Sequence, residues 1–251
     1  MNAQTLAQRL DRELNVKDFT DDSHNGLQVE NRGAITRIAC GVDASLAFFE
    51  LAAAQGANFL VCHHGMSWGD SLKRITGMNY ARLEFLCRHN LALYACHLPL
   101  DAHRRLGNNA EICRVLDLQR LRPFGMYHGR TIGFAGEFPR AMTLAALEQR
   151  VARCVGSTVR TMPFGPARVR RVAVVSGGAA DLVEEAAAAG CDAFLSGEPK
   201  LMAYSLAQEL GIHAIFAGHY DTETFGVSAV GAWIQRKLRI PAEFIRHAVP
   251  F

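Results

Sequence analysis

The chain carries one strand–helix pattern twice, and this repeat constrains its fold more than any other feature of the sequence. In each half an apolar run leads into a helix that ends at a glycine, and a second apolar run follows. The first copy has its runs at 36–42 and 58–62 around a helix at 46–55, and the second has them at 170–178 and 191–199 around 181–190. Gly56 and Gly190 lie 134 positions apart, and the same offset carries His64 onto Glu198. Strands that alternate with helices predict βαβ units in a parallel sheet.

A third strand closes each copy, at 91–96 and at 213–220, and here the offset falls to 122. The second copy is therefore shorter by about the length of the loop at 65–76. The expected fold is α/β, with two similar domains built on duplicated, mostly parallel sheets flanked by helices. We place the domains at 1–123 and 124–251, since 124–140 is glycine-rich and suggests a hairpin, and the last helix could pack back on the first domain. Chance resemblance between two βαβ runs is the alternative.

Composition excludes several classes of protein. Hydrophobic residues make up 49% and charged residues 20%, as in ordinary globular proteins, and the net charge of +3 disfavours direct nucleic-acid binding without ruling it out. The seven cysteines are scattered and form no C-x-x-C pair, which is typical of buried thiols in a reducing cytoplasm. No apolar run approaches the roughly 18 residues of a spanning helix, so we expect a cytoplasmic protein without a membrane partner.

Polar residues with chemical potential gather where the predicted strands end. They occur in five groups, at 63–65, 97–101, 176–178, 196–198 and 219–223. Ligands of open parallel sheets bind outside the carboxyl ends of the strands, so these groups predict one functional edge.

His63 and His64 can both serve a site only at a strand exit, because neighbouring side chains inside a strand face opposite ways. His219 and Glu223 are spaced to share one face of a helix, and Asp101 follows His97 at the same spacing. Taken singly, a His-His pair is as typical of a structural role as of a metal site, and acidic residues are common in a first helical turn without any ligand.

The donor set His63, His64, Asp101, His219 and Glu223 has three imidazoles and two carboxylates. This set has more donors than one ion with closed tetrahedral coordination needs. It suits two divalent ions that keep open coordination positions and share a carboxylate bridge. The absence of thiolate favours Zn, Mn, Fe, Co or Ni. His97 is a candidate catalytic proton shuttle, a partner of a metal ligand, or a buried structural histidine, and the role of Glu198 stays open. Ser176-Gly177-Gly178 could cradle a phosphate, although it lacks the spacing of a known phosphate loop.

Five motifs in order resemble one family. They are G-V-D-A-S at 41–45, G-A-N-F-L-V-C-H-H-G at 56–65, H-L-P-L-D-A-H at 97–103 with G-N-N at 107–109, F-L-S-G-E at 194–198, and G-H-Y-x-T-E at 218–223. They resemble the Ngg-one-interacting-factor-three-like family, also called GTP cyclohydrolase 1 type 2 homologues and dinuclear metal centre hexameric proteins. The resemblance implies metal ligation by the same five residues, metals in a cleft between two α/β domains, and a toroidal homohexamer. Only about 45 residues separate the two copies, so the chain resembles the short form of the family.

The expected function is that of a dinuclear metal-dependent hydrolase that acts on a nucleotide-like or phosphorylated small molecule through metal-bound hydroxide. A phosphoesterase is a second enzymatic hypothesis. The non-enzymatic alternative is a metal-binding hexameric ring that buffers or delivers metal or serves as an interaction scaffold.

Overall fold

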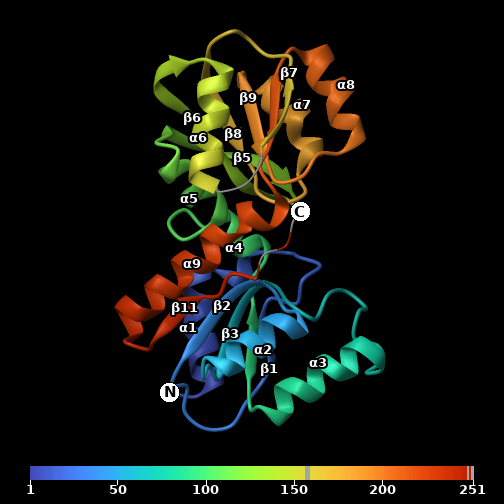
Figure 1. Ribbon diagram of the computed structural model, residues 1–251, viewed down its shortest axis with the longest axis vertical. Coiled ribbons are helices and arrows are strands. Elements are labelled where there is room, and N and C mark those ends of the chain that lie inside the picture. The colour runs from blue at the N-terminus through green and yellow to red at the C-terminus, as the bar shows by residue number, and fades with distance from the viewer. Residues whose placement is uncertain (156–158, 248, 250–251) are drawn as a thin grey trace. The chain divides into compact units, whose positions relative to one another are not determined.

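The computed structural model describes residues 1–155, 159–247 and 249, and spatial contacts divide it into two compact units. The first unit is Met1–Leu100 together with the segment that starts at Gly226. The second unit is Asp101–Phe225. The chain passes from one unit to the other inside two helices, α4 (Leu98–Ala102) and α9 (His219–Leu238) (Figure 1). The predicted domain boundary at residue 123 rests on the glycine-rich stretch at 124–140, whereas these units follow spatial contacts, so that boundary stays a prediction.

The first unit is a five-stranded sheet flanked by helices. Its strands, in the order in which they pair, are β1 (Gly26–Val29), β4 (Ala92–Ala95), β3 (Phe59–His64), β2 (Ile38–Asp43) and β11 (Ala242–Phe244). β1 is antiparallel to β4, and the other neighbours are parallel. Its further helical segments are α1 (Ala3–Leu14), η1 (Val16–Asp18), α2 (Leu46–Ala54) and α3 (Gly77–Arg88).

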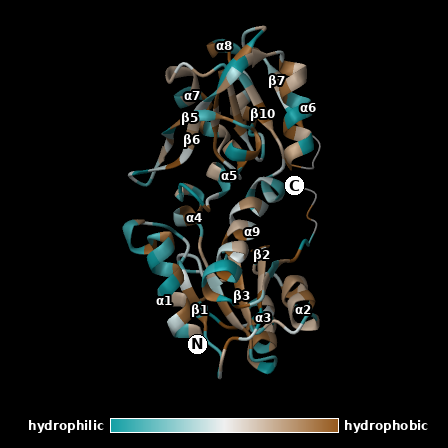
Figure 2. Cartoon of the chain, turned by 90° about the vertical axis from the view of Figure 1, so that its left-hand side faces the viewer, coloured by the Kyte–Doolittle hydropathy of each residue, from teal (hydrophilic) through white to brown (hydrophobic). Residues whose placement is uncertain are grey.

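Local signals explain where these elements begin. The side chain of Asn2 accepts a hydrogen bond from the Thr5 amide and caps α1, and Ser45 caps α2 in the same way through the Phe48 amide. Phe48 and Phe49 of α2 pack with Leu60 in the core of this unit. In Figure 2 brown, hydrophobic stretches run along the central strands of the sheet. Burial of this apolar surface is the main contribution to the stability of the unit.

The second unit is a six-stranded sheet. Its strands, in pairing order, are β5 (Gln119–Tyr127), β6 (Arg130–Met142), β8 (Val169–Val174), β9 (Ala193–Ser196), β10 (His213–Phe216) and β7 (Arg160–Pro163). β8, β9 and β10 are parallel, whereas β5, β6 and β7 each run antiparallel to their neighbours. Its further helical segments are α5 (Asn108–Val115), α6 (Leu144–Val155), η2 (Ala180–Leu182), α7 (Val183–Ala188) and α8 (Leu201–Leu210).

The predicted duplicated α/β fold is confirmed, with sheets that are mixed because antiparallel strands flank the parallel ones. β2, β3 and β4 pair side by side in one unit as β8, β9 and β10 do in the other. The repeat also reaches further back than the sequence indicated, since the preceding strand, β1 or β7, pairs antiparallel with the third strand in both units. The two copies differ most in the segment after their second strand, which is 65–76 in one and 197–200 in the other.

Several elements were absent from the sequence analysis. The antiparallel strands β1 and β7, the helices α5 and α6, and the short β11 had not been predicted. The hairpin expected at 124–140 is present and longer, since its strands cover Gln119–Tyr127 and Arg130–Met142. Within the described part of the chain, no helix is long and apolar enough to cross a membrane.

Candidate functional site

The first unit brings three predicted histidines together at the carboxyl ends of its parallel strands. His63 and His64 are the last residues of β3, and His97 follows β4. The ring centroid of His63 lies 4.7 Å from that of His64 and 5.1 Å from that of His97. His63 is fully buried and the other two are partly buried. Each ring has one nitrogen within 4.8 Å of the others, so this group could hold a metal ion.

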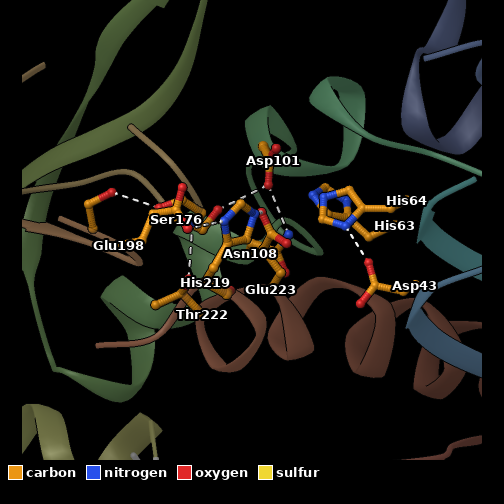
Figure 3. A network of polar contacts seen from close by, with 12 residues as sticks. Asp43, His63, His64, Asp101, Asn108, Ser176, Glu198, His219, Thr222 and Glu223 are labelled. Atoms are coloured by element: carbon orange, nitrogen blue, oxygen red, sulfur yellow. Dashed lines mark hydrogen bonds and ion pairs between the residues drawn. The ribbon is translucent and has the colours of Figure 1, made fainter. Parts of the chain in front are cut away.

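Each of the three imidazoles is oriented through its Nδ1 atom. His63 Nδ1 donates to the carbonyl oxygen of Cys96 at 3.0 Å, and His64 Nδ1 contacts Asp43 Oδ1 at 2.7 Å (Figure 3). His97 Nδ1 contacts the two Asp21 oxygens at 3.0 and 3.2 Å. Histidine ligands commonly use one ring nitrogen for the metal and the other for a carboxylate or carbonyl. In this pattern Nε2 of each ring is the nitrogen that could ligate a metal ion.

Asp21 is a residue of this group that the sequence analysis missed. Its side chain is 3% exposed, and it accepts hydrogen bonds from Asn25 Nδ2 at 2.9 Å and from the Leu98 amide at 3.0 Å. Burial acts to raise the pKa of Asp21, but His97 and the hydrogen bonds from Asn25 and Ser23 outweigh it and hold the pKa at about 2. Asp21 is therefore ionised at neutral pH and fixes His97. Its position, far from His97 in the sequence and inside a polar, turn-rich stretch, carried no local signal of this pairing.

Trp68 adds an aromatic surface to the same group. Its Nε1 donates to the carbonyl oxygen of Gly65 at 2.7 Å, which holds the indole within the loop at 65–76. The ring lies 4.9 Å from His97 in an edge-on arrangement and 5.8 Å from His64. A half-buried indole beside two imidazoles gives this edge of the sheet an apolar wall.

Asp101 belongs to the second unit, where a polar network holds it. The carboxylate is buried, and its Oδ1 accepts from Asn108 Nδ2 at 2.8 Å and from Ser176 Oγ at 3.1 Å. Asn109 Oδ1 in turn accepts from the Ser176 amide at 2.7 Å. The G-N-N motif therefore positions Asp101 and joins it to the exit of β8 (Figure 3).

His219 and Glu223 lie one turn apart at the start of α9, as their spacing predicted. His219 Nε2 is 3.2 Å from Glu223 Oε1, and His219 Nδ1 is 3.3 Å from Glu198 Oε2. Burial lowers the pKa of His219, but the two carboxylates outweigh it and raise the pKa to about 9. Two carboxylates around one imidazole form a cation-binding arrangement, and a divalent ion could take the place of the proton. Glu198, at the position equivalent to His64 in the other repeat, thus contacts this group.

Glycines allow these groups to approach one another. Gly177 has a φ of +65°, and a Cβ added there would lie 2.3 Å from Glu223 Oε1. A Cβ at Gly197 would lie 2.7 Å from both the Gly177 carbonyl oxygen and His219 Cα. Gly177 also donates its amide to Thr222 Oγ1 at 3.1 Å. The Ser-Gly-Gly segment after β8 therefore packs directly against the start of α9.

The chemistry of these groups fits divalent metal ions. The first unit by itself holds three oriented imidazoles. The second unit by itself holds two buried carboxylates and one further imidazole. Mixed nitrogen and oxygen donors are typical of Zn, Mn, Fe, Co and Ni sites. Neutral imidazole and ionised carboxylate are also the protonation states that metal binding selects. The residues proposed from the sequence are thus grouped within each unit, and their joint role as one site stays a prediction.

Comparison with known families and proteins finds one matching family model and several similar proteins that share one name. The family model described as Duf34/NIF3 (NGG1p interacting factor 3) matches residues 1–249. A protein of Archaeoglobus fulgidus named "GTP cyclohydrolase 1 type 2 homolog" is 42% identical over 245 residues, which is 98% of each chain. One of Deinococcus radiodurans with the same name is 42% identical over 240 residues, covering 96% of this chain and 91% of that protein.

Solved structures agree in fold over the full length. Protein ybgI, described as of unknown function, is 32% identical with a TM-score of 0.93 and full coverage of both chains. The TTHA1606 protein of Thermus thermophilus is 36% identical with a TM-score of 0.91, again with full coverage. Reduced HcgD from Methanocaldococcus jannaschii, at 23% identity and a TM-score of 0.86 over 98% of both chains, shares the fold.

Proposed function

Since the chain belongs to the Duf34/NIF3 family, we propose that it is a metal-dependent hydrolase that acts on a nucleotide-like or phosphorylated small molecule. The observation that carries the proposal is the set of three imidazoles whose Nδ1 atoms are all held by oxygen acceptors in the first unit. Such orientation is characteristic of histidines prepared for a metal or for proton transfer.

The proposed ligands are those of the sequence analysis. We propose that His63, His64, Asp101, His219 and Glu223 would hold two divalent ions. The hydrogen bonds from Asn108 and Ser176 to Asp101 support this role, because a ligating carboxylate is commonly held by such partners. When bound, a pair of divalent ions supplies Lewis-acid activation of the substrate and an acidified water.

The chain's own residues supply orientation and proton transfer. Asp43 keeps the Nδ1 proton on His64, so that Nε2 of that ring faces the ligand side. Asp21, ionised and buried, fixes the His97 ring through Nδ1, and Nε2 of His97 is the atom that we propose accepts and returns a proton. Trp68 offers its ring to a planar group of the substrate beside His97.

The nucleotide class rests on the names of the relatives, which are called GTP cyclohydrolase 1 type 2 homologues. With GTP as substrate the hydrolysis opens the imidazole ring of the purine. With a phosphoester the same groups would serve attack at phosphorus, and the two substrate classes are separated by direct comparison of turnover.

We further propose that the protein assembles into a toroidal homohexamer in the cytoplasm. Exposed apolar side chains on α8 support self-association, since Leu201 is 93% and Tyr204 50% exposed. The cytoplasm is supported by the seven cysteines, none of which forms a disulfide within the described part of the chain. Light scattering coupled to gel filtration tests the assembly, and a monomer at micromolar concentration would contradict it.

The test of the function combines metal analysis with turnover of GTP and of a phosphodiester. His63→Ala and Glu223→Ala should each lower bound metal and reduce turnover by at least a hundredfold. His89→Gln is the matched control, because His89 is an exposed histidine at the end of α3 and, among the aromatic rings that the structure describes, stacks on Phe85 alone. A metal-free protein with undiminished turnover would refute the proposal. A fully loaded protein inactive on both substrates would favour a metal-binding ring without catalysis.

A further inference from the structure

The second unit has a hollow lined by arginines that shares no residue with the candidate site. Its volume is about 280 Å³. Its cations are Arg120 and Arg122 of β5 and Arg171 of β8, and Glu137 of β6 is its acidic residue. Ala135, Gly136, Ala189 and Cys191 complete the lining.

The charges of this arginine hollow do not cancel. Glu137 is already engaged by two guanidinium groups, those of Arg120 and of Arg170, the latter through a 3.5 Å contact between Nε and Oε2. Among the residues that the structure describes, no carboxylate pairs with the guanidinium of Arg122 or Arg171. Two cations in excess around one small hollow favour an anion with more than one negative charge.

Backbone features place these arginines. Residues of β5 shift register against β6 between Gln119 and Arg122, as a β-bulge does, and Arg120 within it has a φ of +53°. Bulges re-aim side chains, and the left-handed backbone conformation is one that arginine seldom adopts. Gly136 permits the bulge, since a Cβ there would lie 2.6 Å from Leu121 Cδ2 and 3.0 Å from the Gln119 carbonyl oxygen.

The third arginine is held by the other side of the hollow. The backbone amides of Arg170 and Arg171 both donate to Asp192 Oδ2 at 2.8 Å, and the Arg171 carbonyl oxygen accepts from the Asp192 amide at 2.9 Å. The backbone of Arg171 is therefore held in place in β8, where Arg171 pairs with Glu137 of β6.

We propose that the arginine hollow binds a phosphate or diphosphate group of a small anionic molecule, at a site separate from the metal ligands. Guanidinium groups match phosphate oxygens in a two-pronged geometry and keep their charge at every physiological pH. The volume lies at the lower end of ligand pockets, which fits a phosphate or diphosphate better than a large organic ligand.

The test is calorimetric titration of the purified protein with inorganic pyrophosphate at low ionic strength. We expect one site per chain, with an affinity that falls as salt is added. The double variant Arg122→Gln, Arg171→Gln should bind at least tenfold more weakly. Arg153→Gln is the matched control, an exposed arginine of α6 outside the hollow, and it should bind as the wild type does. Glu223→Ala should also retain binding, which separates this site from the proposed metal centre.

Three results would overturn the proposal. They are the absence of binding to the wild type, undiminished binding to the double variant, and loss of binding in Glu223→Ala. If the double variant fails to fold, protection from phenylglyoxal in the wild type decides the matter by mass spectrometry. Pyrophosphate should then slow modification of Arg122 and Arg171 and leave Arg153 unaffected, whereas equal rates with and without pyrophosphate would refute the site.

Discussion

At the scale of single residues, the candidate site depends on partners that hold its histidines. Asp43 ends β2 directly across the ladder from His64, which ends β3, so the register of two parallel strands brings carboxylate and imidazole together. Asp21 likewise places a carboxylate against the imidazole of His97, although Asp21 lies in an irregular segment and not in a strand. The motif residues are therefore only part of the chemistry, and their supports come from neighbouring elements.

Removal of the Asp43 carboxylate should weaken metal binding without loss of the fold. In Asp43→Ala the His64 ring loses the acceptor that fixes its tautomer, and such losses cost about 10–100-fold in metal affinity. Competition with a chromogenic chelator measures the change. Asp70→Ala is the control, because Asp70 forms an exposed ion pair with Lys73, and it should leave the affinity unchanged. Equal affinities of wild type and Asp43→Ala would show that this contact is structural.

The cysteines should differ sharply in reactivity. Burial raises the pKa of Cys40 and of Cys113 to about 12 and that of Cys191 to about 11, so their thiolate fractions at pH 8 are negligible. Cys87 is exposed on α3. Iodoacetamide followed by mass spectrometry should label Cys87 first in the folded protein, and labelling of Cys40 at the same rate would contradict this assignment.

At the scale of elements, the sequence predicted those that carry their own pattern. β2, β3, β4, β9 and β10 lie in mainly apolar runs, β8 becomes apolar after its two arginines, and α2 and α7 end near glycine. β1 and β7 are four residues each, are only partly buried, and gain their pairing from strands far along the chain. No local periodicity predicts such a strand. α6 does have a pattern, since Leu147, Val151 and Val155 recur every fourth residue, and this spacing is typical of a helix with one buried face.

The residues of the candidate site also divide into those with a local sequence pattern and those without one. Histidines and acids at strand exits can be recognised because the sequence predicts the strands themselves. Asp21 and Trp68 lie in irregular segments, and their contacts with His97 depend on tertiary structure alone.

The turn after β8 offers a prediction at this scale. Gly177→Ala should both strain the backbone and displace Glu223, because the added Cβ would meet Glu223 Oε1 at 2.3 Å. Gly56→Ala is a matched control, since Gly56 has a similar φ of +73° and nothing within 4 Å of an added Cβ. Each variant should lose about 1 kcal/mol of stability through the backbone. Gly177→Ala alone should also lose metal affinity by tenfold or more, and parallel behaviour of the two variants would contradict the proposed packing.

At the scale of the whole molecule, each sheet contains a strand that lies after the other copy of the repeat in the sequence. β11 follows the second copy in the sequence and pairs with β2 of the first, whereas the β5–β6 hairpin follows the first copy and pairs through β6 with β8 of the second. Both additions lie beside the first strand of the other copy's parallel trio, although β11 is parallel to its neighbour and β6 antiparallel.

Removal of β11 should therefore destabilise the first unit. A chain that ends at Arg239 exposes the edge of β2 and removes Ala242 and Ile245, both buried. We expect a melting temperature lower by about 5 °C or more, with increased light scattering. Arg37→Ala is the control, because it breaks only the exposed ion pair with Glu243 and should cost no more than about 1 kcal/mol. An unchanged melting temperature of the truncated chain would show that β11 contributes little.

The position of β11 has a consequence for the order in which the first sheet can form. β11 lies after the whole second copy in the sequence, yet it pairs with β2, a strand near the start of the first copy. A ribosome therefore has to synthesise the second copy before the first sheet can gain this strand. Pairing between segments so far apart in the sequence is slow compared with local contacts. Until β11 is in place, the edge of β2 stays exposed to other chains.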